Sequence, residues 1–156
     1  MASMELLVKG LDTAIWEMGE AFKGLPDEDV WKRPDPRLLS VGEIAAHVAY
    51  WEAQSFFGEG FESPFAASAA RYYTTSAPEP FELSIGAEAV YAEVKRIHEA
   101  AKASFLANPH DSEEPNPYRG NWTWGSTLEY QAFHIAYHTG QMYSVRHLLG
   151  HETVDN

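Results

Sequence analysis

The sequence predicts an all-α protein, a four-helix bundle with long connecting loops. Apolar residues recur at three- and four-residue steps in four separate segments, and helix start and stop signals bracket those segments. No segment alternates convincingly between apolar and polar residues with the period of two that indicates a half-buried strand. With 156 residues, of which 45% are hydrophobic, the chain suits a single domain spanning residues 1–156.

The first two helices lie on either side of a proline-containing loop. The first is expected over about Met4–Lys23. Its apolar stripe consists of Leu7, Val8, Leu11, Ile15, Met18 and Phe22. The second is expected to begin at Ser40, because Ser40 and Glu43 match the capping box, in which serine accepts from a free helix amide and glutamate reaches back. It should end near Gly58 or Gly60.

The third and fourth helices complete the bundle. The third is expected over about Gly86–Leu106, with Ser84 as its candidate N-cap. Its apolar stripe consists of Ala87, Val90, Val94, Ile97, Ala101 and Phe105. The fourth should open at Ser126, where the residues STLE match a second capping box, and should run to His147 or Leu149.

Two connections are long and rich in aromatic residues, one over about residues 60–83 and one over about 108–125. Long loops in compact domains often cover functional sites. The first is long enough to cross from one end of the bundle to the other, and either has room for a short helix.

The composition excludes several classes of partner and several kinds of chemistry. The formal net charge is −12 and no basic cluster is present, which argues against nucleic acid and anionic membranes as partners. With no cysteine, the chain has no disulfide, thiolate ligand or cysteine nucleophile of its own. The N-terminal MASMELLVKG does not resemble a signal peptide, and no apolar run approaches the roughly 20 residues of a membrane helix, so we expect a cytoplasmic protein.

Two histidines in FHIAYHTGQM, His134 and His138, lie one helical turn apart on the same predicted face. Side chains at this spacing can bind one metal ion together. The pair alone is a weak signal, because two hydrogen-bonded histidines on a core face would give the same pattern.

A third histidine strengthens the metal hypothesis. His47 lies among apolar residues in EIAAHVAYW, so we expect it to face the interior. A buried imidazole needs a partner, and three inward histidines are satisfied together by one ion. Three protein ligands also leave a coordination position open, as in catalytic zinc sites. The remaining histidines are predicted to have structural or no special roles: His98, His110, His147 and His151.

Other metal and nucleophile chemistries do not fit the sequence. The zinc-protease signature needs a glutamate directly after its first histidine, where this chain has Ile135. Di-iron bundles need glutamate three residues before histidine, and none of the seven histidines has it. We find neither a phosphate-binding glycine loop nor a nucleophile elbow. No residue is assigned as a general base.

Four further residues share helix faces with the histidines and could line a pocket: Trp51, Gln54, Tyr130 and Gln141. The simpler interpretation of each is ordinary core packing.

His47, the motif HIAYHTGQM, the entry SVGEIAAHVAYWE and the closing VRHLLG together resemble the DinB/YfiT-like family, and the likeness covers nearly the whole chain. The resemblance implies a four-helix bundle, a metal triad of His47, His134 and His138, nickel or zinc as the ion, and a homodimer. Some relatives are transferases that use low-molecular-weight thiols such as bacillithiol or mycothiol, and others isomerise maleylpyruvate.

The functional hypothesis is a metal-dependent enzyme of the thiol-transferase type. An ion on three neutral imidazoles keeps its positive charge and would hold an external thiol as thiolate, ready to attack a small electrophilic substrate. A metal-dependent hydrolase, which acts through metal-bound hydroxide, is the nearest enzymatic alternative. A structural ion or a site that only binds a ligand is a second, and a metal-free bundle that works by dimerising is a third.

Overall fold

The computed structural model describes residues 3–70 and 79–153, and this part of the chain contains five α-helices and no β-strand. The helices are α1 (Met4–Phe22), α2 (Val41–Phe57), α3 (Pro64–Ser68), α4 (Ala87–Ala107) and α5 (Trp124–Leu148). The all-α prediction is confirmed. Among the described helices, none combines the length and apolar character needed to cross a bilayer.

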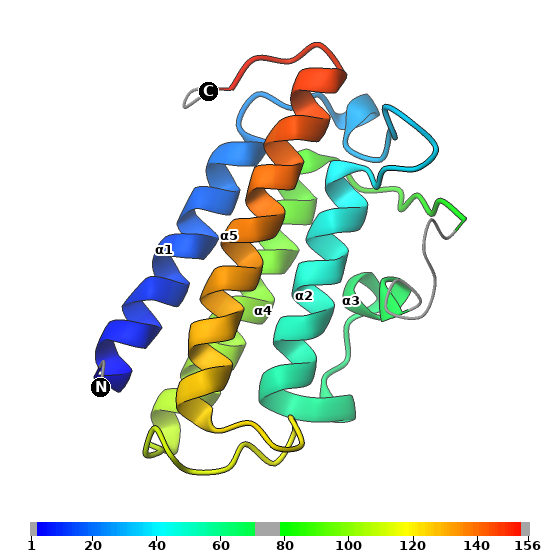
Figure 1. The fold of residues 1–156 in the computed structure, drawn as a ribbon. Coiled ribbons are helices and arrows are strands. Elements are labelled where there is room, and N and C mark those ends of the chain that lie inside the picture. The colour runs from blue at the N-terminus through cyan, green and yellow to red at the C-terminus, as the bar shows by residue number, and fades with distance from the viewer. Residues whose placement is uncertain (1–2, 71–78, 154–156) are drawn as a thin grey trace.

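The four long helices lie side by side (Figure 1). The packed neighbours are α1 with α5, α5 with α2, α2 with α4, and α4 with α1. Helices α1 and α5 run in one direction, whereas α2 and α4 run in the other, so the α2–α4 connection returns along the length of the bundle. The short helix α3 lies in this connection, and residues 71–78 of it lie outside the described part. The long crossover and the short helix that the sequence suggested are both present.

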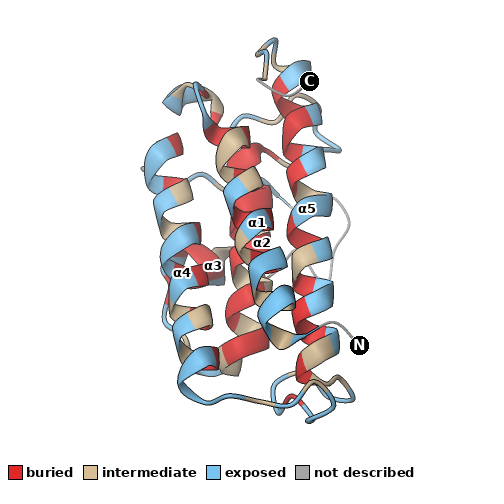
Figure 2. Ribbon diagram, turned by 90° about the vertical axis from the view of Figure 1, so that its left-hand side faces the viewer, coloured by how far each residue is buried: buried red, intermediate tan, exposed pale blue. Residues whose placement is uncertain are grey.

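The core lies between the long helices, whose buried residues face inward and whose exposed residues face outward (Figure 2). All six residues of the stripe predicted for α4 are buried. On α1, four of the predicted stripe residues are buried, namely Leu11, Ile15, Met18 and Phe22, while Leu7 and Val8 are only half-buried. The period of the apolar residues therefore identified the inward face of each of these helices.

Helix α2 begins at the predicted capping box. Ser40 Oγ accepts from the Glu43 amide (3.2 Å), and the Glu43 carboxylate accepts from the Ser40 amide (2.8 Å). The same carboxylate forms a buried bidentate ion pair with Arg33, whose Nε and Nη2 lie 2.8 and 2.6 Å from its oxygens. This pairing ties the preceding loop to the first turn of α2 and fixes the start of the helix at Val41, six residues before His47.

The predicted start of α5 is wrong by one turn. The helix begins at Trp124, and its N-cap is Thr123 instead of Ser126. Thr123 Oγ1 accepts from the Ser126 amide (3.2 Å), and Ser126 Oγ accepts from the Thr123 amide (3.0 Å). The helix extends backward because this reciprocal pair satisfies the free amides and because Trp124 is buried in the core.

The predicted N-cap of α4 is also wrong. Gly86 occupies the N-cap position and offers no side chain, and Asp27 Oδ1 accepts from the Ala87 amide instead (2.8 Å). Asp27 is 60 residues away in the sequence and belongs to the 3-10 turn Asp27–Asp29 after α1. The cap is therefore a tertiary contact, which the sequence around Ser84 could not indicate.

We expect Asp27→Ala to lower the free energy of unfolding by about 1 kcal/mol, the usual effect of removing a helix cap. Ser84→Ala is the matched control, because Ser84 is exposed and its side chain makes no hydrogen bond within the described part. Urea denaturation followed by circular dichroism measures both. Equal losses in the two variants would contradict the assignment of the cap to Asp27.

Candidate metal centre

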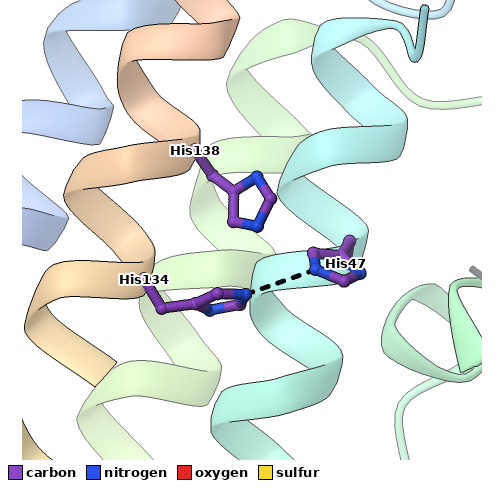
Figure 3. Close-up of side chains that lie close together, drawn as sticks. All are labelled: His47, His134 and His138. Carbon is purple, nitrogen blue, oxygen red and sulfur yellow. Dashed lines mark hydrogen bonds between the residues drawn. The ribbon is translucent and has the colours of Figure 1, made fainter. Parts of the chain in front are cut away.

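Three histidines from two helices meet where α2 packs against α5 (Figure 3). His134 Nε2 lies 3.3 Å from His47 Nε2. The ring centroid of His138 lies 4.7 Å from that of His47 and 4.5 Å from that of His134. One nitrogen from each ring lies within 4.8 Å of the other two. The structure thus brings together the three histidines that the sequence singled out.

Hydrogen bonds indicate which ring nitrogens are available to bind a metal ion. His138 Nδ1 lies 2.7 Å from Gln141 Oε1, so the imidazole donates there and its Nε2 carries the lone pair. His47 Nδ1 and His134 Nδ1 are buried and have no hydrogen-bond partner within the described residues. Buried polar atoms are normally partnered, so these two Nδ1 atoms are exceptions, while the Nε2 atoms of the same rings face each other.

Burial keeps the cluster uncharged. It lowers the pKa of His47 to about 4 and that of His134 to about 3, and the neighbouring His138 adds to both shifts. Burial also lowers the pKa of His138, although its hydrogen bond with Gln141 acts in the opposite direction. At neutral pH all three imidazoles are therefore neutral, which is the form that binds a metal ion.

The donor set fits a divalent ion. Two imidazole nitrogens bound to one tetrahedral ion at about 2.0–2.1 Å lie roughly 3.3 Å apart. The Nε2–Nε2 distance of 3.3 Å between His47 and His134 matches this value. Within the described part of the chain the cluster holds three histidines and no carboxylate, the ligand number that leaves a position for an external ligand.

The cluster forms part of the wall of a cavity of about 840 Å³. The other lining residues are Trp51, Tyr118, Arg119, Gly120, Trp122, Tyr130, Phe133 and Tyr137. Of the expected pocket residues, Trp51 and Tyr130 line this cavity. Gln141 lines an adjacent cavity of about 380 Å³ and contacts His138, whereas Gln54 lines neither of the two.

The α4–α5 loop supplies a part of the cavity that the sequence did not indicate, above all Arg119 and Trp122. The guanidinium carbon of Arg119 lies 4.8 Å from the Trp122 ring centroid and 5.2 Å from that of Trp51. A loop has no period that tells which side chains face a site. The available signal was compositional, since the stretch YRGNWTWG places one arginine among aromatic residues in an acidic chain.

The other histidines form a different pattern. His98 is fully buried, and its ring nitrogens lie 2.8 Å from Glu52 and 2.9 Å from Asp12. Asp12, His98 and Glu99 are also close enough to hold an ion, but Lys102 Nζ already lies 2.8 Å from Asp12 Oδ1. We therefore interpret this group as an ion-pair network.

The three remaining histidines lie outside the cluster. His110 and His151 each contact a carboxylate, Glu114 at 2.8 Å and Asp29 at 2.7 Å. His147 is exposed and contacts Thr153.

The fold and the site define a helical protein with a histidine cluster compatible with a divalent metal. A family model described as the DinB superfamily matches residues 11–142. The chain therefore belongs to the DinB superfamily, and the match contains all three histidines of the cluster. Searches among curated proteins and among solved structures found no match.

Proposed function

We propose that the protein is a metal-dependent enzyme of the thiol-transferase type, which joins an external thiol to a small electrophile. The observation that carries the proposal is the position of the cluster. His47, His134 and His138 supply three neutral nitrogens on the wall of a cavity large enough for two small reactants. Nickel or zinc suits imidazole ligands and also binds thiolate sulfur.

The proposed reaction is a substitution in which the thiol sulfur replaces a leaving group on the electrophile. When bound, a divalent ion lowers the pKa of a thiol that ligates it. The thiol sulfur forms a bond to the electrophilic carbon, and the leaving group departs with its bonding electrons while the thiol proton goes to solvent. If the electrophile is an activated alkene, no group leaves, and the second alkene carbon takes up the proton. The chain has no cysteine, so the sulfur must come from a second molecule.

The residues of the chain position the reactants. Gln141 holds the His138 ring through Nδ1 and so directs Nε2 toward the cluster. The aromatic rings of Trp51, Tyr130 and Phe133 form apolar walls that can bind the body of an organic substrate and exclude water.

The test begins with protein purified without a histidine tag and without added metal. Metal analysis should find close to one nickel or zinc ion per chain. The loaded protein should then accelerate conjugation of bacillithiol, mycothiol or cysteine to 1-chloro-2,4-dinitrobenzene, and removal of the metal by a chelator should abolish the acceleration. Metal binding without conjugation of any of these thiols would overturn the transferase and leave a hydrolase or a binding protein. Absence of bound metal would overturn the whole proposal.

A further inference from the structure

Arg119 has an unusual environment at the cavity of the histidine cluster. Its guanidinium carbon lies over the rings of Trp51 and Trp122, 5.2 and 4.8 Å from their centroids. Aromatic faces attract a guanidinium, and an arginine stacked in this way keeps its in-plane N–H donors for another partner. Among the residues lining the cavity, Arg119 is the one that carries a permanent charge.

Arg119 also differs from the other arginines of the described part. Arg33, Arg37 and Arg96 each pair with a carboxylate. Arg146 donates to the backbone carbonyls of three residues. Arg119 has no carboxylate partner within the described residues, and its Nε is buried without a hydrogen-bond acceptor. Arg146 Nε also lacks an acceptor, but the Nη atoms of Arg146 donate to backbone carbonyls, whereas Arg119 makes no side-chain hydrogen bond within the described residues. In a chain with 23 acidic residues, a guanidinium left in this state indicates a partner from outside the chain.

The loop that carries Arg119 is held in place by the protein itself. Asn116 is buried, and its Nδ2 donates to the backbone carbonyl of Ser55 at the end of α2 (2.9 Å). The Asn116 amide donates to the Trp122 carbonyl (2.8 Å), and the amides of Arg119 and Trp122 close further turns within the loop. The guanidinium is thus positioned before any ligand arrives, which lowers the entropic cost of binding.

We propose that Arg119 binds a carboxylate on the small molecule that occupies this cavity. A planar guanidinium matches a carboxylate through two parallel hydrogen bonds. The surrounding rings of Trp122, Tyr118 and Phe133 suit an organic body attached to that carboxylate. The inference deepens the proposed function and rests on it for the identity of the molecule, because either the thiol or the electrophile can carry the carboxylate.

The experiment is a calorimetric titration of the full-length protein as purified, with its metal content measured in parallel. Two matched pairs of ligands are used: 3-mercaptopropionate against 3-mercaptopropanamide, and 3-phenylpropionate against 3-phenylpropanamide. Each acid differs from its amide in the negative charge. A charge-assisted pair contributes on the order of 10-fold or more in affinity, so the wild type should prefer the acid by about that factor in at least one pair.

The variants decide the interpretation. Arg119→Gln should remove the preference for the acid and leave the affinity for the amide unchanged. Arg96→Gln is the control, because Arg96 is half-exposed and pairs with Glu93 on α4. Arg119→Lys keeps the charge without the planar fork and should recover part of the preference, which provides a second readout if the glutamine variant folds poorly.

Loss of the preference in the mercapto pair assigns the carboxylate to the thiol, and loss in the phenyl pair assigns it to the second reactant. A ratio of acid to amide affinity that Arg119→Gln leaves unchanged in both pairs would overturn the inference, as would a wild type that shows no preference. The metal content separates the two proposals, since metal-free protein refutes the proposed function while the affinity ratio still tests Arg119.

Discussion

The His138→Ala variant is expected to lose stoichiometric metal while its far-UV circular dichroism spectrum remains helical. His138 supplies one of three nitrogens, and the two that remain hold an ion far less tightly. Removing an outer partner of a metal ligand lowers affinity by about 10- to 100-fold, and removing the ligand itself should exceed that. The fold should survive because His138 is only half-buried and lines the cavity instead of the core.

Metal content and melting temperature, measured on the same samples, test this prediction. An ion that binds the folded state and not the unfolded state raises the stability of the folded state. A chelator should therefore lower the melting temperature of the wild type and leave that of His138→Ala unchanged. Unchanged metal content in the variant would remove the histidine cluster as the metal site.

Two control variants on the same helix sharpen the result. Gln141→Ala removes the hydrogen bond to His138 Nδ1 and should weaken the metal affinity by about 10- to 100-fold without abolishing binding. His147→Ala removes an exposed histidine whose ring contacts Thr153, and it should leave metal binding unchanged. A graded response across the three variants would assign the ion to this face of α5.

The histidine cluster could be predicted because helical geometry is local and regular. A separation of four residues places His134 and His138 on one face in any α-helix. The apolar neighbours of His47 indicated that it faces inward, and two inward faces of one bundle can meet. The sequence could not show the ring orientations or the contact of His134 with His47, because these depend on how α2 and α5 pack.

The cap of α4 and the role of Arg119 could not be predicted because each depends on a tertiary contact, which no local signal carries. The box of Ser40 and Glu43 was correct because all of its hydrogen bonds lie within one turn. The cap of α4 comes from Asp27, whose proximity depends on the complete bundle. Arg119 was missed for the same reason, since the buried Asn116 fixes its loop through a contact with α2.

Disrupting the buried ion-pair network around His98 should lower the free energy of unfolding more than any other change considered. His98 on α4 lies between Glu52 of α2 and Asp12 of α1, at 2.8 and 2.9 Å. Burial lowers the pKa of His98, but the hydrogen bonds and charges of the two carboxylates outweigh it and raise the pKa overall. The cationic ring thus joins three helices.

We expect His98→Gln to lower the free energy of unfolding by about 3–5 kcal/mol, the effect of removing one partner of a buried ion pair. Glu52 is fully buried, and its Oε2 already has no hydrogen-bond partner within the described residues. Without the imidazolium its charge would be uncompensated. His151→Gln is the control, because the pair of His151 with Asp29 is only partly buried and should contribute about 0–1 kcal/mol.

The effect should also depend on pH in a definite direction. Because the pKa of His98 is raised in the folded state, its stabilising contribution is fully present below the ordinary histidine pKa of about 6.5 and is lost as the pH rises through the raised value. Urea denaturation should therefore show a larger difference between the wild type and His98→Gln at pH 6 than at pH 9. A loss below about 1 kcal/mol at pH 6 would mean that His98 is neutral in its buried position. If His98→Gln does not fold, Asp12→Asn weakens the same network from its exposed side and should show a smaller loss of the same sign.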